Sequence, residues 1–114
     1  MSESHTQAAI MKAIGSRSDT RIFRNTVGFG WQGVLLSSRN GTIVLKNARP
    51  ITYGLAPGSA DLIGIHDGRF VSIEVKGEKT RVQKNQTHWM QMVLDMGGIA
   101  GIARSVEDVE RLLV

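Results

Sequence analysis

Two carboxylates and a lysine stand close together in the sequence, in a pattern that suits phosphodiester chemistry. Asp61 comes first, and Glu74 and Lys76 follow in one short run. The segment between them predicts a β-hairpin, because Asp67-Gly68 suits the two central positions of a type I′ turn, both of which need a positive φ. Counting outward from that turn, the register places Asp61 opposite Glu74.

The expected strands of this hairpin cover residues 60–65 and 70–76, and their side chains alternate between two faces. Asp61, Glu74 and Lys76 share one face. The other face carries apolar side chains that we expect to form the core, namely Leu62, Val71, Ile73 and Val75.

Opposed carboxylates repel each other across a β-ladder, so something must offset the repulsion. A divalent cation would do so, since Mg²⁺ takes oxygen ligands and commonly binds one or two carboxylates together with substrate phosphate. Lys76 would then point at the scissile phosphate or at the attacking water. The three residues together predict metal-assisted phosphodiester hydrolysis. A Glu-x-Lys run also occurs on ordinary surface strands, and a slip of one residue would send the carboxylates to opposite faces.

The charge distribution favours a polyanionic partner. Fourteen Lys and Arg against ten Asp and Glu give a net charge of +4, and no acidic residue lies between Asp19 and Asp61. Many ordinary soluble domains are equally basic, so the charge supports the hydrolytic site without establishing it. The candidate nucleic-acid contacts are Arg21, Arg24, Asn25, Arg39, Lys46, Arg49, Lys79, Arg81 and Lys84.

The composition also excludes several classes of protein. The 114 residues contain no cysteine, which rules out disulfides and thiolate metal sites and fits a reducing cytoplasm. His5, His66 and His88 are too scattered to predict a zinc site. We find no apolar run of membrane-spanning length and no secretory start, so we expect no membrane partner. One domain over residues 1–114 is expected.

The remaining pattern predicts the elements around the catalytic hairpin. We expect helices over residues 3–14, 81–96 and 106–113, strands over 22–25 and 99–103, and a second hairpin over 34–36 and 42–45 that turns at Asn40-Gly41. This order indicates an α/β sandwich around a mixed sheet. In the 81–96 helix, Trp89, Val93 and Met96 fall at core spacings, while Gln83 and Gln86 are either on the site side or plain surface residues.

Two strings resemble a known family. Residues 54–64, which read GLAPGSADLIG, and Ile73-Glu74-Val75-Lys76 resemble the core of the virus-type replication-repair nuclease (VRR-NUC) domain of the PD-(D/E)XK nuclease superfamily. Further matches are Glu3 and Gln7, residues 24–26 with Gly28, Gln86 with Trp89, and residues 104–108. The resemblance spans nearly the whole chain and implies a mixed β-sheet flanked by helices, with an extra β-hairpin. Pro57 stands four residues before Asp61 rather than immediately ahead of it, where the superfamily pattern has its proline.

The resemblance also implies roles for individual residues. Asp61 and Glu74 would bind Mg²⁺ or Mn²⁺ with help from the backbone carbonyl of Val75, and Glu3 would add a metal contact. Lys76 would orient the water, and Gln86 would support the site.

Members of this length resemble stand-alone phage or bacterial enzymes, which form homodimers similar to Holliday junction resolvases. The implied function is therefore a structure-selective DNA endonuclease of replication and repair, working in the cytoplasm of a bacterial cell or a phage-infected host and leaving 5′-phosphate ends. Two alternatives stay open. One is a non-catalytic nucleic-acid-binding module on the same scaffold, and the other is a restriction enzyme, for which 114 residues leave little surface to read bases.

Overall fold

A mixed four-stranded sheet lies at the centre of the molecule. The computed structural model describes residues 2–114 and orders the sheet β1-β4-β5-β6. The strands are β1 (Thr20–Arg24), β4 (Leu62–His66), β5 (Arg69–Val75) and β6 (Ile99–Ala103). β4 pairs antiparallel with both β1 and β5, while β6 runs parallel to β5. The fold is therefore α/β with a mixed sheet, as the sequence predicts.

The β4–β5 hairpin has the predicted register. Leu62 lies opposite Ile73, and Ile65 lies opposite Phe70. The turn residues Asp67 and Gly68 have φ values of 47° and 82°, the positive values that a type I′ turn requires. The four side chains expected in the core, Leu62, Val71, Ile73 and Val75, are all buried.

Two helices cover one face of the sheet. These are α1 (Glu3–Gly15) and α3 (Val106–Leu112), which supply Ile10, Ile14 and Val109 to the core beneath them. α3 begins where a capping residue predicts, because Ser105 Oγ accepts a hydrogen bond from the backbone N–H of Asp108. No helix among residues 2–114 is both long and apolar enough to cross a membrane.

The third helix, α2 (Lys84–Asp95), packs against β5 and β6 on the opposite face. Trp89 Nε1 donates a hydrogen bond of 2.7 Å to Ser72 Oγ, and Ser72 alternates with the core residues of β5. The sequence predicted that this helix begins at residue 81, which is three residues too early. Gln86 Oε1 accepts a hydrogen bond from the backbone N–H of Gln83 and so caps the helix at that residue. Met96 was wrongly placed in the core. It follows the last helical residue and is 80% exposed.

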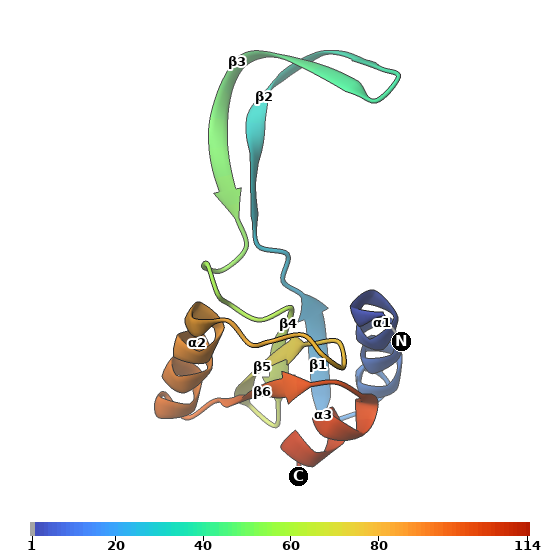
Figure 1. Cartoon of the computed structure of the whole chain (residues 1–114), viewed down its shortest axis with the longest axis vertical. Helices are drawn as coiled ribbons and strands as arrows, with labels where there is room; N and C mark the ends of the chain where they lie inside the picture. The colour runs from blue at the N-terminus through green and yellow to red at the C-terminus, as the bar shows by residue number, and fades with distance from the viewer. Residues whose placement is uncertain (1) are drawn as a thin grey trace.

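A long two-stranded ribbon projects from the sheet (Figure 1). We call it the arm, residues 28–53, formed by β2 (Gly28–Arg39) and β3 (Thr42–Tyr53). The Asn40-Gly41 turn is confirmed, with φ values of 49° and 77°, but the strands are much longer than predicted. Their glycine-rich start pairs with the end of β3, where Gly28 lies opposite Tyr53. A Cβ atom on Gly28 would lie 2.5 Å from Tyr53 Oη.

Candidate active site

The hairpin brings Asp61 and Glu74 together at one end of the sheet. Asp61 immediately precedes β4, and Glu74 is the second-last residue of β5. The backbone N–H of Val75 donates a hydrogen bond of 3.0 Å to Asp61 Oδ2. The carboxyl groups of Asp61 and Glu74 are close enough to hydrogen-bond with each other. The two acids are therefore neighbours, as the register predicts.

Glu74 is a buried acid with a raised pKa. Its side chain is 4% exposed, and this burial, followed by the hydrogen bond and charge of Asp61, raises the pKa of Glu74 to about 8. The charge of the Lys76 ammonium lowers the pKa of Glu74, and the charge of the Glu3 carboxylate raises it. A hard cation could take the place of the shared proton, because both groups offer the oxygen ligands that Mg²⁺ and Mn²⁺ prefer.

The loop before Asp61 is fixed by a buried asparagine at the end of β1. Asn25 Nδ2 donates to Ser59 Oγ and to the Ala60 carbonyl, each at 2.8 Å, and Asn25 Oδ1 accepts from the Leu55 N–H. The Asn25 backbone N–H donates to the Asp61 carbonyl at 2.8 Å. The Asn25 side chain is buried and paired within the protein at the cavity wall, and its contact with nucleic acid stays a prediction.

The two carboxylates line a largely polar cavity of about 430 Å³. Besides Asp61 and Glu74, its lining residues come from α1, the end of β1 and the segment that follows it, the loop before Asp61, and the start of α2. Gln86 lies on this wall, on the site side of its helix, while its Oε1 also caps the helix. The other lining residues are Gln7, Arg24, Asn25, Thr26, Val27, Gly58, Ser59, Gln83 and Asn85.

Ser59 and Asn85 are wall residues that the sequence did not single out. The sequence indicates a site role for these two residues only weakly, since Ser59 lies in a turn-like loop and Asn85 lies at the polar start of a helix. Gly58 has a φ of 85°, and a Cβ atom there would lie 2.6 Å from the Asn85 carbonyl oxygen. Only glycine lets the loop approach α2 this closely.

Lys76 and Glu3 lie beside the cavity rather than on its wall. Lys76 is 7% exposed and faces a separate hollow of about 220 Å³ that Thr6 and Arg104 also line. Glu3 Oε2 accepts a hydrogen bond of 2.9 Å from Thr80 Oγ1. The roles of Lys76, of Glu3 and of the Val75 carbonyl in catalysis stay predictions.

The predicted basic footprint divides into separate regions. Arg24 lines the cavity, and Lys79, Arg81 and Lys84 follow one another along the segment that leads into α2 beside it. Arg39, Lys46 and Arg49 lie on the arm, where Arg49 donates two hydrogen bonds to Gln32 Oε1.

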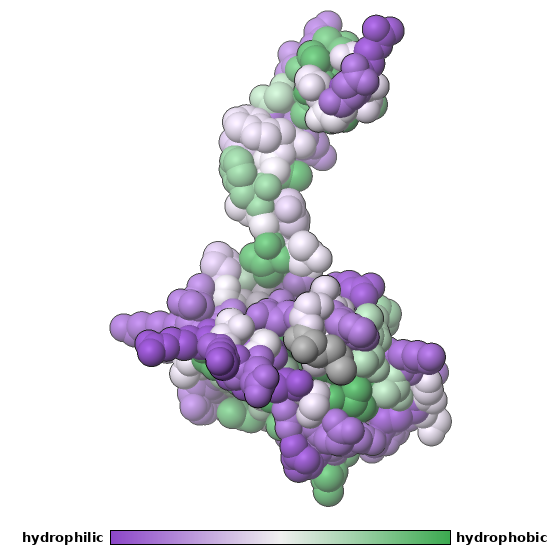
Figure 2. Space-filling model, turned by 45° about the vertical axis from the view of Figure 1, so that its right-hand side comes forward, coloured by the Kyte–Doolittle hydropathy of each residue, from purple (hydrophilic) through white to green (hydrophobic). Residues whose placement is uncertain are grey.

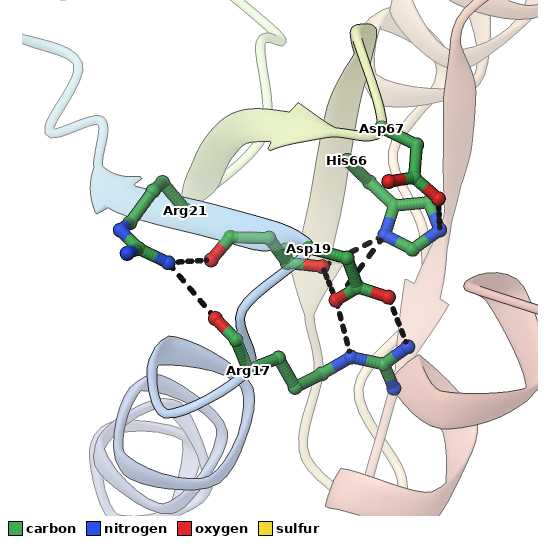
Figure 3. A network of polar contacts seen from close by, with 6 residues as sticks. Arg17, Asp19, Arg21, His66 and Asp67 are labelled. Atoms are coloured by element: carbon green, nitrogen blue, oxygen red, sulfur yellow. Dashed lines mark hydrogen bonds and ion pairs between the residues drawn. The ribbon is translucent and has the colours of Figure 1, made fainter.

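Arg21 lies away from the cavity that Arg24 lines. It lies toward the far end of β1 and donates to the carbonyls of Arg17 and Thr20 (Figure 3). Its contact with nucleic acid stays a prediction.

A second polar cluster ties β1 to the β4–β5 turn (Figure 3). Asp19, His66 and Asp67 form the one trio of potential metal ligands within 4.8 Å of one another among residues 2–114. Arg17 binds Asp19 in bidentate fashion and holds the pKa of that acid well below its ordinary value.

His66 Nδ1 in this cluster lies 2.7 Å from Thr20 Oγ1. These partners already satisfy the cluster, so we interpret it as structural. It lies at the opposite end of β4 from Asp61, roughly 16 Å away by the rise of a strand. His66 therefore has a packing role that the sequence did not reveal.

One comparison with known proteins gives a match. The model of the VRR-NUC domain family matches residues 34–107. This segment contains Asp61, Glu74, Lys76 and Gln86 and leaves out Glu3. A search of curated proteins finds no match to the chain.

Proposed function

Because the chain belongs to the VRR-NUC domain family, which has the PD-(D/E)XK-like fold and implies a nuclease-type function, we propose that it is a metal-dependent DNA endonuclease. The observation that carries the proposal is the pair of adjacent carboxyl groups, Asp61 and Glu74, on the wall of a polar cavity. Phosphodiester hydrolysis would explain why a small protein keeps two acids side by side on a cavity wall.

The donor set fits Mg²⁺ or Mn²⁺. Asp61 and Glu74 would hold the ion, with the Val75 carbonyl and Glu3 as the additional proposed contacts. When bound, such an ion supplies Lewis acidity toward a phosphate oxygen and toward the attacking water.

The other residues would position the substrate and the water. The Val75 N–H keeps the Asp61 carboxylate in place. We assign Lys76 to orienting the water and to balancing negative charge as the phosphate is attacked. Gln86 would support the cavity wall, and Arg24 and Lys84 would hold flanking phosphates.

The proposed substrate is branched DNA, such as a Holliday junction, cut to leave a 5′-phosphate during replication or repair. A homodimer would hold two such sites and allow paired nicks. We place this activity in the cytoplasm of a bacterial cell or a phage-infected host.

The test compares the wild type with the isosteric variants Asp61→Asn and Glu74→Gln. Purified proteins are incubated with junction, flap and duplex DNA in Mg²⁺, in Mn²⁺ or in EDTA. Each variant should lose cleavage by about 100-fold or more, because it removes a charged ligand. Glu107→Gln on the exposed side of α3 serves as a matched control and should cleave like the wild type.

Far-UV circular dichroism must show that all variants are folded. Cleavage by Glu74→Gln at the wild-type rate would reject the proposed site. DNA binding by the wild type without cleavage in any metal would instead favour the non-catalytic binding module.

A further inference from the structure

The arm carries positive charge and no negative charge. Arg39, Lys46 and Arg49 are its three basic residues, and no acidic residue occurs between Asp19 and Asp61. All three basic side chains are exposed. In the part of the chain that the structure describes, no ion pair involves a residue of the arm. The charge of the arm is therefore available to an anion from outside the protein.

The strand register places the three cations on one side of the arm. Side chains of a strand alternate between two faces, and each of the two bulges in the ribbon adds one residue to one strand. Counted in this way, three cross-strand pairs share what we call the basic face: Gln32–Arg49, Val34–Lys46 and Arg39–Thr42.

The opposite face of the arm is apolar. Trp31, Ile43 and Leu45 belong to pairs that alternate with those of the basic face. Together with Ala48 they line a hollow of about 480 Å³. This hollow supports the register independently, because its lining residues all lie on one side of the ribbon. The basic face is thus separate from the apolar one, and it suits an anionic partner.

Arg49 is held in place on the basic face without losing its charge. Its Nε and Nη2 donate hydrogen bonds of 3.1 Å and 2.7 Å to Gln32 Oε1. Gln32 is neutral, so this contact orients the guanidinium and leaves it cationic. A guanidinium has five N–H donors, and those that Gln32 does not use can bind a phosphate.

The arm begins and ends beside the proposed active site. Thr26 and Val27 lead into β2, and Gly58 and Ser59 follow β3. All four residues line the same cavity as Asp61 and Glu74. A long polyanion that is held in the cavity can therefore continue along the arm.

We infer that the basic face of the arm binds the phosphate backbone of the DNA duplex that flanks the cut. The inference rests on the proposed function, which brings DNA to the cavity, and it adds a second contact surface outside the cavity. Figure 2 shows hydrophilic side chains gathered at the free end of the arm, where β2 ends at Arg39.

The length of the arm sets the reach of this contact. β2 has 12 residues, which span roughly 35–40 Å when a strand is straight. The two bulges bend the ribbon and shorten its reach (Figure 1). DNA rises about 3.4 Å per base pair, so Arg39 would reach a phosphate about 7–10 base pairs from the cavity.

A duplex fits the basic face better than a single strand does. Proteins hold single-stranded DNA on aromatic side chains that lie beside the cations. The register instead places Phe29 and Trp31 on the opposite face from the cations, where their rings pack edge to face with centroids 5.8 Å apart. Arginine and lysine contacts with phosphate hold a duplex without reading its sequence. We therefore expect the arm to bind a duplex of any sequence.

Fluorescence anisotropy with a labelled duplex that extends past the arm tests the inference, in EDTA so that no cutting occurs. The double variant Arg39→Gln, Lys46→Gln should lower the slope of log affinity against log salt by about 1.8, because two phosphate contacts are lost. Lys12→Gln, Arg111→Gln is the matched control. It also removes one lysine and one arginine, both exposed and outside the cavity wall, and should keep the wild-type slope.

The control separates a local contact from bulk charge, because both variants lower the net charge of +4 by two. Equal losses of slope in the two variants would overturn the inference. An arm variant with the wild-type slope would also overturn it and would leave an acidic protein as the partner that the basic face fits. Cutting plays no part in this measurement. Binding through the arm by a protein that cleaves no DNA would support the inference and reject the endonuclease.

A second measurement locates the arm on the DNA. The chain has no cysteine, so Thr42→Cys gives a single attachment point on the basic face for an iron chelate that cuts nearby DNA. On a junction, the chelate should cut about 7–10 base pairs from the position where the wild type cuts in Mg²⁺. Glu107→Cys, on the exposed side of α3, is the control and should give no cuts there. A chelate at Thr42 that leaves the flanking duplex uncut would contradict the inference.

Discussion

At the scale of single residues, Glu74 has the most unusual environment in the molecule. It is an acid that burial and the neighbouring Asp61 keep protonated near neutral pH. The sequence predicted the pairing of the two acids, because the Asp-Gly turn and the apolar alternation both specify the register. It could not predict how deeply Glu74 is buried, since α2 and β6 provide that cover from later in the chain.

This environment predicts a pH-dependent stability for the metal-free protein. The pKa of Glu74 is about 8 in the folded state against an ordinary value of 4.5. The folded state therefore binds more protons than the unfolded state between those values, and the free energy of unfolding falls as pH rises through that window. In the Glu74→Gln variant this side chain does not titrate, so the variant lacks this contribution to the pH dependence. The Tm of the variant relative to the wild type should rise by roughly 5–10 °C from pH 5 to pH 8.

Differential scanning fluorimetry in EDTA measures this difference, and the other titrating groups cancel because both proteins share them. A Tm difference that is flat with pH would contradict the assigned environment of Glu74. Adding Mg²⁺ should raise the Tm of the wild type more at pH 8 than at pH 6, because the ion competes with the proton for the same oxygens. Glu74→Gln should show little of this response.

At the scale of elements, the connection between β1 and the loop before Asp61 decides how the site is held. Asn25 makes this connection, because its side chain hydrogen-bonds with Leu55, Ser59 and Ala60, which lie 30 to 35 residues away in the chain. Sequence periodicity reports only local spacing, so it could not reveal these contacts, and Asn25 was predicted only as a nucleic-acid contact. The arm was underestimated for a related reason, since its glycine-rich start is strand through pairing with residues 49–53, which come later in the chain.

Asn25→Ala should destabilise the protein by about 2–4 kcal/mol, because it leaves buried polar groups without partners. Urea denaturation provides the measurement. The control is Gln32→Ala, which removes an amide of similar hydrogen-bonding capacity from the exposed arm and should change stability by no more than about 0.5 kcal/mol. If the two variants lose equal stability, the proposed role of Asn25 is wrong.

At the scale of the whole molecule, the basic residues are distributed over distinct surfaces. Arg24 and Arg21 lie on the same strand but at different ends of it. Arg24 lines the cavity, whereas Arg21 lies beside the polar cluster around Asp19. Net charge predicted a polyanionic partner correctly in kind, in keeping with the DNA substrate that the family implies. It could not say which cations share a surface, because that depends on how the chain folds.

This distribution predicts two different salt dependences of DNA binding. In a Glu74→Gln background that does not cleave, Arg24→Gln should lower the slope of log affinity against log salt by about 1, because one phosphate contact is lost. Arg21→Gln should leave the slope unchanged. Fluorescence anisotropy with a labelled duplex gives both slopes, and equal slopes for the two variants would place the DNA elsewhere.

The cavity wall is assembled from distant parts of the chain, and this has a consequence for the timing of activity during synthesis. A growing polypeptide on the ribosome has Asp61 and Glu74 long before α2 and β6 have emerged to enclose them. Until then the cavity lacks the wall that Gln83, Asn85 and Gln86 supply. A chain that has not yet completed α2 therefore lacks the recess that the proposed reaction needs.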